Sequence, residues 1–177
     1  RRSPHEAGIA YERFIGYQYE QQGNKVHYQG ALAGRQDLGI DLVCRFENRY
    51  LIVQCKRLSP AVGAPVRENT VAQVFGAAAY WREAALKKGE ILENSLVIPT
   101  IVTSFELSEQ AKAFARLLPV DFRENELFRS YPAIKCNLKA NGDKIYHLPM
   151  DQQYDKIDMS REGTSYVDTV IEATERG

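Results

Sequence analysis

Residues 40–56 read IDLVCRFENRYLIVQCK, and this stretch decides the fold. It contains two runs rich in aliphatic and aromatic residues, 40–46 and 50–56, separated by the short polar segment 47–49. Two such runs around a short polar segment predict a β-hairpin. Apolar residues stand at consecutive positions in each run, so we expect both strands to be partly buried on two faces.

The hairpin makes a testable statement about register. If Glu47 and Asn48 form a two-residue turn, Phe46 pairs with Arg49. Counting back along both strands from this pair places residue 41 opposite residue 54. A slip of one residue would turn every side chain to the other face of the sheet.

In this register three polar side chains converge on one face, those of Asp41, Gln54 and Lys56. The opposite face carries an apolar set suited to a core: Leu42, Cys44, Leu51, Val53 and Cys55. Charged and polar groups within apolar strands are costly unless they are paired or bind a metal. The register therefore favours a functional site over a purely structural hairpin.

The chemistry of these side chains suits a divalent metal site. Mg²⁺ prefers oxygen ligands, so the expected ligands are the Asp41 carboxylate, the Gln54 side-chain oxygen and the Cys55 carbonyl. The ammonium of Lys56 suits a place beside an attacking water or a phosphorane that is gaining charge. Taken singly, Asp41 and Lys56 are ordinary strand-end residues, and only their combination indicates catalysis.

The N-terminal segment predicts a helix that begins at Ser3 and runs to about Gln22. Ser3 is the expected N-cap, with Pro4 in the first turn and Glu6 completing a capping box, and Gly23 ends the helix. Its apolar stripe consists of Ala7, Ala10, Tyr11, Phe14 and Ile15.

Glu12 lies in this helix between Gly8 and Gly16, each four residues away. Glycine within a helix is costly, so the two glycines suggest close backbone approach or open space around Glu12. We expect Glu12 to hold metal through water or to orient the site; a surface acid is the alternative.

The remaining segments predict further elements. They are a strand at 25–28, a loop at 30–37, a helix at 66–88 with apolar positions Val71, Val74, Phe75, Ala78 and Ala85, a buried strand at 95–103 with Pro99 at an edge, bulge or end, a helix from Ser108 to about Leu118, and a hairpin of 134–138 with 145–147. This order indicates an α/β fold in which helices flank a mixed β-sheet. We expect a main domain at 1–129 and a small β-hairpin and helix extension at 130–177.

The composition indicates a soluble globular protein. The 177 residues suit one domain with a small appendage, and 44% are hydrophobic and 26% charged. No apolar run is long enough for a membrane span, and the first residues lack the apolar middle of a secretory signal, so we expect a cytoplasmic protein without membrane contact. The three cysteines form no CxxC pair, so we expect reduced thiols.

The 23 basic and 23 acidic residues balance, which argues against a large basic face that grips nucleic acid. Any such contact must be local. The segment 45–57 carries a small basic patch, and from it we expect Arg45 and Arg57 to contact nucleic acid. Solvated strand ends are the alternative interpretation of this patch.

The pattern AYERFIGYQYEQQGNKVHYQG…DLGIDLVCRFENRYLIVQCKR resembles the catalytic domain of the Mrr-like restriction endonucleases, in the PD-(D/E)XK nuclease superfamily. The shared motifs are the aromatic-Glu pair at 11–12, DLGID at 37–41 and QCK at 54–56. VTSFELSEQAKAFA at 102–115 resembles the family's later strand and helix, and Gln73 stands where the family often has a glutamine. The resemblance covers about residues 6–118.

This resemblance implies hydrolysis of DNA phosphodiesters with Mg²⁺, for which Mn²⁺ substitutes. Asp41 is then a metal ligand, Gln54 replaces the more usual acid, Lys56 is the catalytic lysine, and Gln73 is a further expected DNA contact. Restriction-type defence is the first expected role, and cleavage of DNA junctions or repair intermediates is the alternative. Cutting both strands would require two sites, so a homodimer is a further expectation. The glutamine also leaves open a weak or inactive module that binds nucleic acid or a partner protein.

Overall fold

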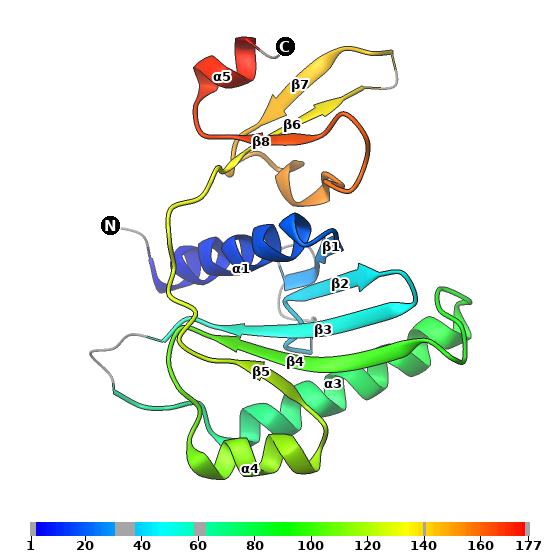
Figure 1. The fold of residues 1–177 in the computed structure, drawn as a ribbon, viewed down its shortest axis with the longest axis vertical. Coiled ribbons are helices and arrows are strands. Elements are labelled where there is room, and N and C mark those ends of the chain that lie inside the picture. The colour runs from blue at the N-terminus through cyan, green and yellow to red at the C-terminus, as the bar shows by residue number, and fades with distance from the viewer. Residues whose placement is uncertain (1–2, 31–37, 59–62, 140, 176–177) are drawn as a thin grey trace.

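The computed structural model describes residues 3–30, 38–58, 63–139 and 141–175 (Figure 1). The elements, in chain order, are α1 (Pro4–Gln21), β1 (Lys25–Tyr28), β2 (Leu42–Phe46), β3 (Arg49–Lys56), α3 (Glu68–Lys87), β4 (Leu96–Thr103), α4 (Glu109–Leu117), β5 (Asp121–Arg123), β6 (Ile134–Leu138), β7 (Lys144–His147), the 3₁₀ turn η2 (Tyr154–Lys156), β8 (Ser165–Val167) and α5 (Val170–Glu175).

The main sheet has five strands in the order β1-β2-β3-β4-β5. β1, β2 and β3 form an antiparallel meander, whereas β4 and β5 continue the sheet in parallel. α1 covers one face of this sheet, and α3 and α4 cover the other (Figure 1). The predicted α/β fold, a mixed sheet flanked by helices, is confirmed.

The predicted hairpin is present in the predicted register. Phe46 pairs with Arg49, and the pairing continues to Leu42 and Val53. Glu47 has a φ of 53°, in the left-handed region that a tight two-residue turn requires. The turn therefore sets which side chains of β2 and β3 share a face.

Each face of the sheet has its own core, as the consecutive apolar residues indicated. The core under α1 contains Leu42, Cys44, Leu51 and Val53, with Cys55 packed against it. The core under α3 contains Ile40, Val43, Tyr50 and Ile52. The apolar face predicted from the register is thus the face that α1 covers.

α1 begins as predicted. The Ser3 hydroxyl accepts from the Glu6 backbone N–H at 3.2 Å, and the Ser3 N–H donates to the Glu6 carboxylate at 2.6 Å. Of the expected stripe, Tyr11, Phe14 and Ile15 are buried, whereas Ala7 and Ala10 are only half-buried.

The two glycines around Glu12 differ in their surroundings. A Cβ on Gly16 would lie 2.5 Å from the Tyr28 ring, so this glycine lets β1 approach α1. A Cβ on Gly8 would meet nothing within 4 Å. Close approach, one of the two expected reasons for these glycines, therefore accounts for Gly16, and open space is found at Gly8.

The two helices on the opposite face are confirmed with small shifts. α3 begins at Glu68, two residues later than predicted, because Val66 forms an isolated bridge with Leu107. Phe75 is 38% exposed, so its predicted place in the buried stripe was wrong. The Ser108 hydroxyl caps α4 by accepting from the Ala111 N–H at 3.1 Å.

Pro99 lies within β4, where it is paired with Ile52 of β3. β5 begins opposite Thr100, so at Pro99 the strand has a neighbour on one side only. A residue without an N–H is tolerated at such an edge, as predicted. β5 itself was not predicted, since three residues are too short for a recognisable pattern.

Residues 134–167 form the second sheet, in the order β7-β6-β8. The predicted hairpin is β6 with β7, and the third strand, β8, was not predicted. The loop predicted at 30–37 lies, apart from Gly30, outside the described residues.

The extension contacts the side of α1 that faces away from the main sheet (Figure 1). The Arg13 guanidinium donates to both carboxylate oxygens of Asp155, at 2.9 and 2.6 Å, and to the Pro149 carbonyl at 2.7 Å. Lys25 pairs with Asp158 at 2.7 Å. Ion pairs therefore join the extension to both α1 and β1.

A buried lysine lies at the centre of this contact. Lys135 is 0% exposed, and its ammonium lies 4.5 Å from the ring centre of Tyr28 and 4.7 Å from that of Tyr154. The Glu20 carboxylate is 4.0 Å away and accepts from the Tyr166 hydroxyl. Burial lowers the pKa of Lys135 and raises that of Glu20, so each group depends on the other and on the tyrosine rings.

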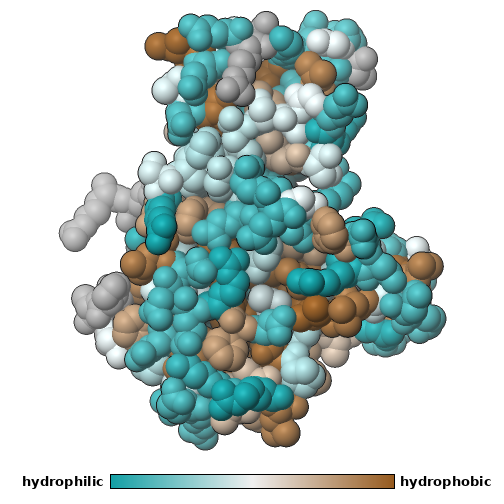
Figure 2. All heavy atoms as spheres, viewed as in Figure 1, coloured by the Kyte–Doolittle hydropathy of each residue, from teal (hydrophilic) through white to brown (hydrophobic). Residues whose placement is uncertain are grey.

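The visible surface is mostly hydrophilic, with hydrophobic residues in small separate groups (Figure 2). Within the described part of the chain, no helix has the length and apolar character needed to cross a membrane.

We expect Lys135→Met to destabilise the protein by about 3 kcal/mol, because it leaves the Glu20 carboxylate buried without its cation. The double variant Lys135→Met/Glu20→Gln should lose less than the two single variants together. Lys88→Met, in an exposed pair with Glu90, is the control and should cost about 0.5 kcal/mol or less. Urea unfolding measures all four; strictly additive losses would contradict the coupling.

Candidate active site

Asp41 lies one residue ahead of β2, at the end of the hairpin far from the turn. Its backbone N–H donates to the Val53 carbonyl at 2.9 Å, and its carboxylate accepts from the Cys55 N–H at 2.6 Å. The ladder ends at Leu42, so the predicted pair of Asp41 with Gln54 is not formed. The cause is local: the Asp41 N–H bonds one residue short of regular pairing, as in a bulge. The carboxylate is thereby tied to the backbone of β3.

A second carboxylate approaches from α1. A Cβ placed on Gly30 would lie 3.2 Å from Asp41 Oδ1 and 3.2 Å from Glu12 Oε2. Since both oxygens are near one point, they cannot be further apart than twice this distance. The Gly30 N–H also donates to the Asp41 carbonyl at 3.1 Å. The structure therefore brings Glu12 and Asp41 together, and Gly30, expected only as a loop residue, provides the space between them.

The Cys55 side chain lies beside these two acids. Burial raises the pKa of the Cys55 thiol, and the negative charges of Asp41 and Glu12 raise it further. The thiol is therefore neutral and unsuited to be a nucleophile or a thiolate ligand. What Cys55 offers to a cation is its backbone carbonyl.

Gln54 lies on the α3 face of the sheet and is 2% exposed. A Cβ on Gly39 would lie 2.7 Å from Gln54 Nε2 and 2.6 Å from Gln73 Nε2, so both amides approach the same glycine. Gly39 has a φ of 79°, which favours glycine independently of this contact. The structure thus brings Gln73, from α3, to the side of Gln54.

The Gln54 side-chain oxygen is buried and has no hydrogen-bond partner among the described residues. A buried acceptor without a partner costs about 1–3 kcal/mol. A cation beside this oxygen would remove the cost.

Lys56 ends β3 two residues after Gln54, so the two side chains share a face of the strand. Lys56 is half-buried, and within the described ranges no salt bridge involves it. Its carbonyl accepts from the Ser104 N–H at 3.0 Å, which joins this end of β3 to the end of β4. Lys56 therefore lies at the strand end where Asp41 meets Cys55.

The residues expected to contact nucleic acid lie in different places. Arg57 follows β3 directly and is exposed beside the site. Arg45 pairs with Tyr50 at the opposite end of the hairpin, six residues or about 20 Å along β3 from Lys56. Its side chain donates to the Glu47 carbonyl and lies over the Tyr50 ring. The structure therefore does not bring Arg45 to the site.

Among the residues that the structure describes, no three His, Cys, Asp or Glu side chains gather as a metal-binding group. A cation site here has to combine the Asp41 and Glu12 carboxylates with an amide or carbonyl oxygen. Asp37, the first residue of the DLGID motif, lies outside the described residues.

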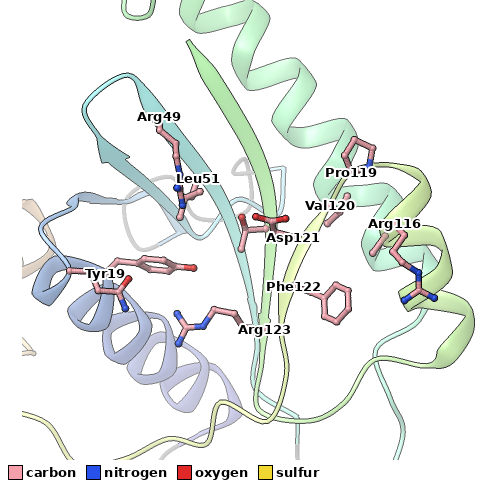
Figure 3. Close-up of a pocket in the computed structure, with 12 residues that line it drawn as sticks. Tyr19, Arg49, Leu51, Arg116, Pro119, Val120, Asp121, Phe122 and Arg123 are labelled. Atoms are coloured by element: carbon pink, nitrogen blue, oxygen red, sulfur yellow. The ribbon is translucent and has the colours of Figure 1, made fainter.

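A cavity of about 580 Å³ lies at the other end of the sheet (Figure 3). Arg49 opens β3 at this cavity, whereas Lys56 ends the same strand. Of the described lining residues, only Asp121 is acidic, and the Arg123 guanidinium already pairs with Glu126 at 2.8 Å. Without a second carboxylate, this cavity lacks the donors of a catalytic metal site.

The fold, a five-stranded mixed sheet flanked by helices, belongs to the restriction-endonuclease-like class. The family model for the Mrr catalytic domain, described as a restriction endonuclease, matches residues 6–123, and the chain belongs to this family. The match covers α1 and all five strands of the main sheet. No characterised protein and no solved structure matches the chain.

We expect Gly39→Ala to disturb the two glutamines, because its methyl group would overlap both amides. Gly89→Ala is a matched control, since Gly89 has a φ of 69° with nothing within 4 Å of a Cβ. The control should cost about 1 kcal/mol for backbone strain alone. Gly39→Ala should cost about 2 kcal/mol more by thermal unfolding. Equal losses would contradict the crowding at Gly39.

Proposed function

We propose that this chain is a metal-dependent endonuclease that hydrolyses DNA phosphodiester bonds. One observation carries the proposal: the Glu12 and Asp41 carboxylates converge on Gly30 at the end of β3 that carries Gln54 and Lys56. Family membership supports the nuclease class. DNA as substrate, metal dependence and the role of each residue belong to the proposal.

The donors suit a hard divalent cation such as Mg²⁺, with Mn²⁺ able to replace it. Asp41, the Gln54 side-chain oxygen and the Cys55 carbonyl would hold it, with Glu12 acting through water. The unpartnered Gln54 oxygen fits this set, because a cation gives it the interaction that the described residues do not. When bound, the cation supplies charge neutralisation at the phosphate and a more acidic water.

The chain's own residues prepare the site in distinct ways. The Cys55 N–H fixes one oxygen of Asp41 and leaves the other oriented towards Glu12. Lys56 provides a cation for the phosphate as it gains negative charge, and its N–H donors orient the attacking water. Arg57 is the nearest residue of the basic patch and would contact a neighbouring phosphate.

The neutral side chain of Gln54 supports a second candidate function. Gln54 carries no charge where a carboxylate would bind a cation more strongly, so a module that binds nucleic acid without cutting it is the alternative. If the site is active, we propose restriction-type defence as the role of the nuclease, with cleavage of DNA junctions or repair intermediates as the alternative role. Cutting both strands requires two sites, for which we propose a homodimer.

We also propose that residues 1–129 form the nuclease domain and that residues 130–177 form its extension.

We expect Asp41→Ala to abolish Mg²⁺-dependent cleavage of DNA by at least 10²-fold while leaving the fold intact, because the carboxylate that anchors the site is lost. Wild-type protein should also gain thermal stability with Mg²⁺ or Mn²⁺, and the variant should not. Asp143→Ala, in the extension, is the control. Unaltered cleavage by Asp41→Ala would refute the assignment.

Gln54→Glu tests whether the amide weakens the site. A carboxylate adds a negative charge to the ligands, so half-maximal activity should require less Mg²⁺. If neither wild type nor Gln54→Glu cuts single-stranded, duplex or branched DNA, and neither is stabilised by metal, the binding module is the better description.

A further inference from the structure

A second cleft lies on the α3 side of the sheet, next to residues 38–40. It has a volume of about 570 Å³ and lies between β1, residues 38–40 and the second half of α3. Its lining includes Gln29, Leu38, Ile40, Tyr80, Trp81 and Lys88. None of these residues has a part in the proposed hydrolysis.

Two aromatic residues of α3 form one wall of this cleft. Tyr80 is 65% exposed, so its ring is available to a ligand. Trp81 is half-buried, and its ring lies 5.5 Å from that of Tyr50, which holds it in place. A fixed indole next to an exposed phenol offers flat apolar surface to a planar ligand.

Leu38 also lines the cleft. It is 51% exposed and has a φ of 54°, which is rare for a residue with a branched side chain. Backbone held in this region clusters at functional sites. Leu38 is therefore displayed to solvent three residues before the catalytic aspartate.

Along the chain, the cleft adjoins the proposed active site. Residues 38–40 line it or border it, and Asp41 follows directly. Along α3, Gln73 and Tyr80 are seven residues apart, which places them on nearly the same face about 10 Å from each other. A ligand in the cleft is thus within one or two nucleotides of a phosphate at Asp41.

The polar groups of the cleft suit a nucleotide. Gln29 offers an amide donor and acceptor on the wall formed after β1. Lys88 provides a cation, and its partner Glu90, 3.9 Å away, also lines the cleft; both side chains are exposed, so the pair is weak and Lys88 can turn to a phosphate. Planar apolar walls, an amide and a cation are the groups that recognise a base and its phosphate.

We propose that this cleft binds an unpaired nucleobase of the strand being cut, stacked on Tyr80 and Trp81, with Leu38 filling the place the base leaves in the helix. This inference rests on the proposed nuclease function. The base must be unpaired, because within a duplex both of its faces are covered by neighbouring bases. Apolar side chains inserted between base steps are a known way to hold such a distortion.

The chain contains one tryptophan, so Trp81 fluorescence reports on this cleft alone. The experiment uses the full chain carrying Asp41→Ala, which prevents cutting, and titrates single-stranded oligothymidylate, a duplex with one bulged thymidine, a fully paired duplex and thymidine monophosphate. We expect quenching by the first two, weaker binding of the paired duplex, and binding of the mononucleotide only at far higher concentration.

Substitution of Tyr80 separates stacking by the ring from hydrogen bonding by the hydroxyl group. Tyr80→Ala should weaken binding of the bulged duplex about fivefold or more, as loss of a stacking platform does. Tyr80→Phe keeps the ring and should bind as the parent does, and Tyr146→Ala removes an exposed tyrosine of the extension and should have no effect.

The outcomes separate this inference from the function on which it rests. DNA cleavage by the unsubstituted chain, with Trp81 fluorescence unchanged by every oligonucleotide, would overturn the cleft and leave the nuclease intact. Quenching by unpaired DNA without cleavage in any metal would leave the cleft and overturn the nuclease. Tight binding of thymidine monophosphate would mean that the cleft binds a free nucleotide, not a base within a strand. An equal loss of binding affinity in Tyr80→Phe and Tyr80→Ala would exclude stacking.

Discussion

The rest of the structure depends on the antiparallel pairing of β2 with β3 in one register. The two-residue turn pairs Phe46 with Arg49, and the period of two along each strand then assigns every side chain to a face. A bulge at Asp41 then ends the ladder at Leu42, and the Asp41 carboxylate accepts from the Cys55 N–H. The register thus sets the packing of the two cores, and the local bulge sets the position of the Asp41 carboxylate.

Two glycines give the site its space. At Gly30 the missing side chain allows the Asp41 and Glu12 carboxylates to approach from different elements, and at Gly39 it allows two amides to approach the loop. Both acids lie beside the buried Cys55 thiol, whose pKa they raise. The two acids thus meet at the end of β3 where Lys56 lies, and this arrangement carries the proposed cation site.

α1 connects the site to the extension. One side of this helix packs on the sheet and carries Glu12, while Arg13 and Glu20 hold residues of the extension. The buried Lys135 and the tyrosine rings around it make this contact specific, because a buried charge is stable only in the geometry that compensates it. The extension therefore restrains the helix that carries Glu12.

The sequence by itself determined what depends on neighbours along the chain: the capping box at Ser3, the turn after Phe46, the cap at Ser108 and the hairpin of β6 with β7. It also predicted Asp41, Gln54 and Lys56 as site residues from the hairpin's register. That register is observed, whereas the pair of Asp41 with Gln54 is not formed. Only the tertiary structure showed that Gly16 gives the Tyr28 ring room to pack against α1 and that Arg45 lies far from the site. It also showed that three-residue strands such as β5 complete the sheets. These features depend on contacts between distant segments, and their energy comes from burial and close approach that no local pattern records.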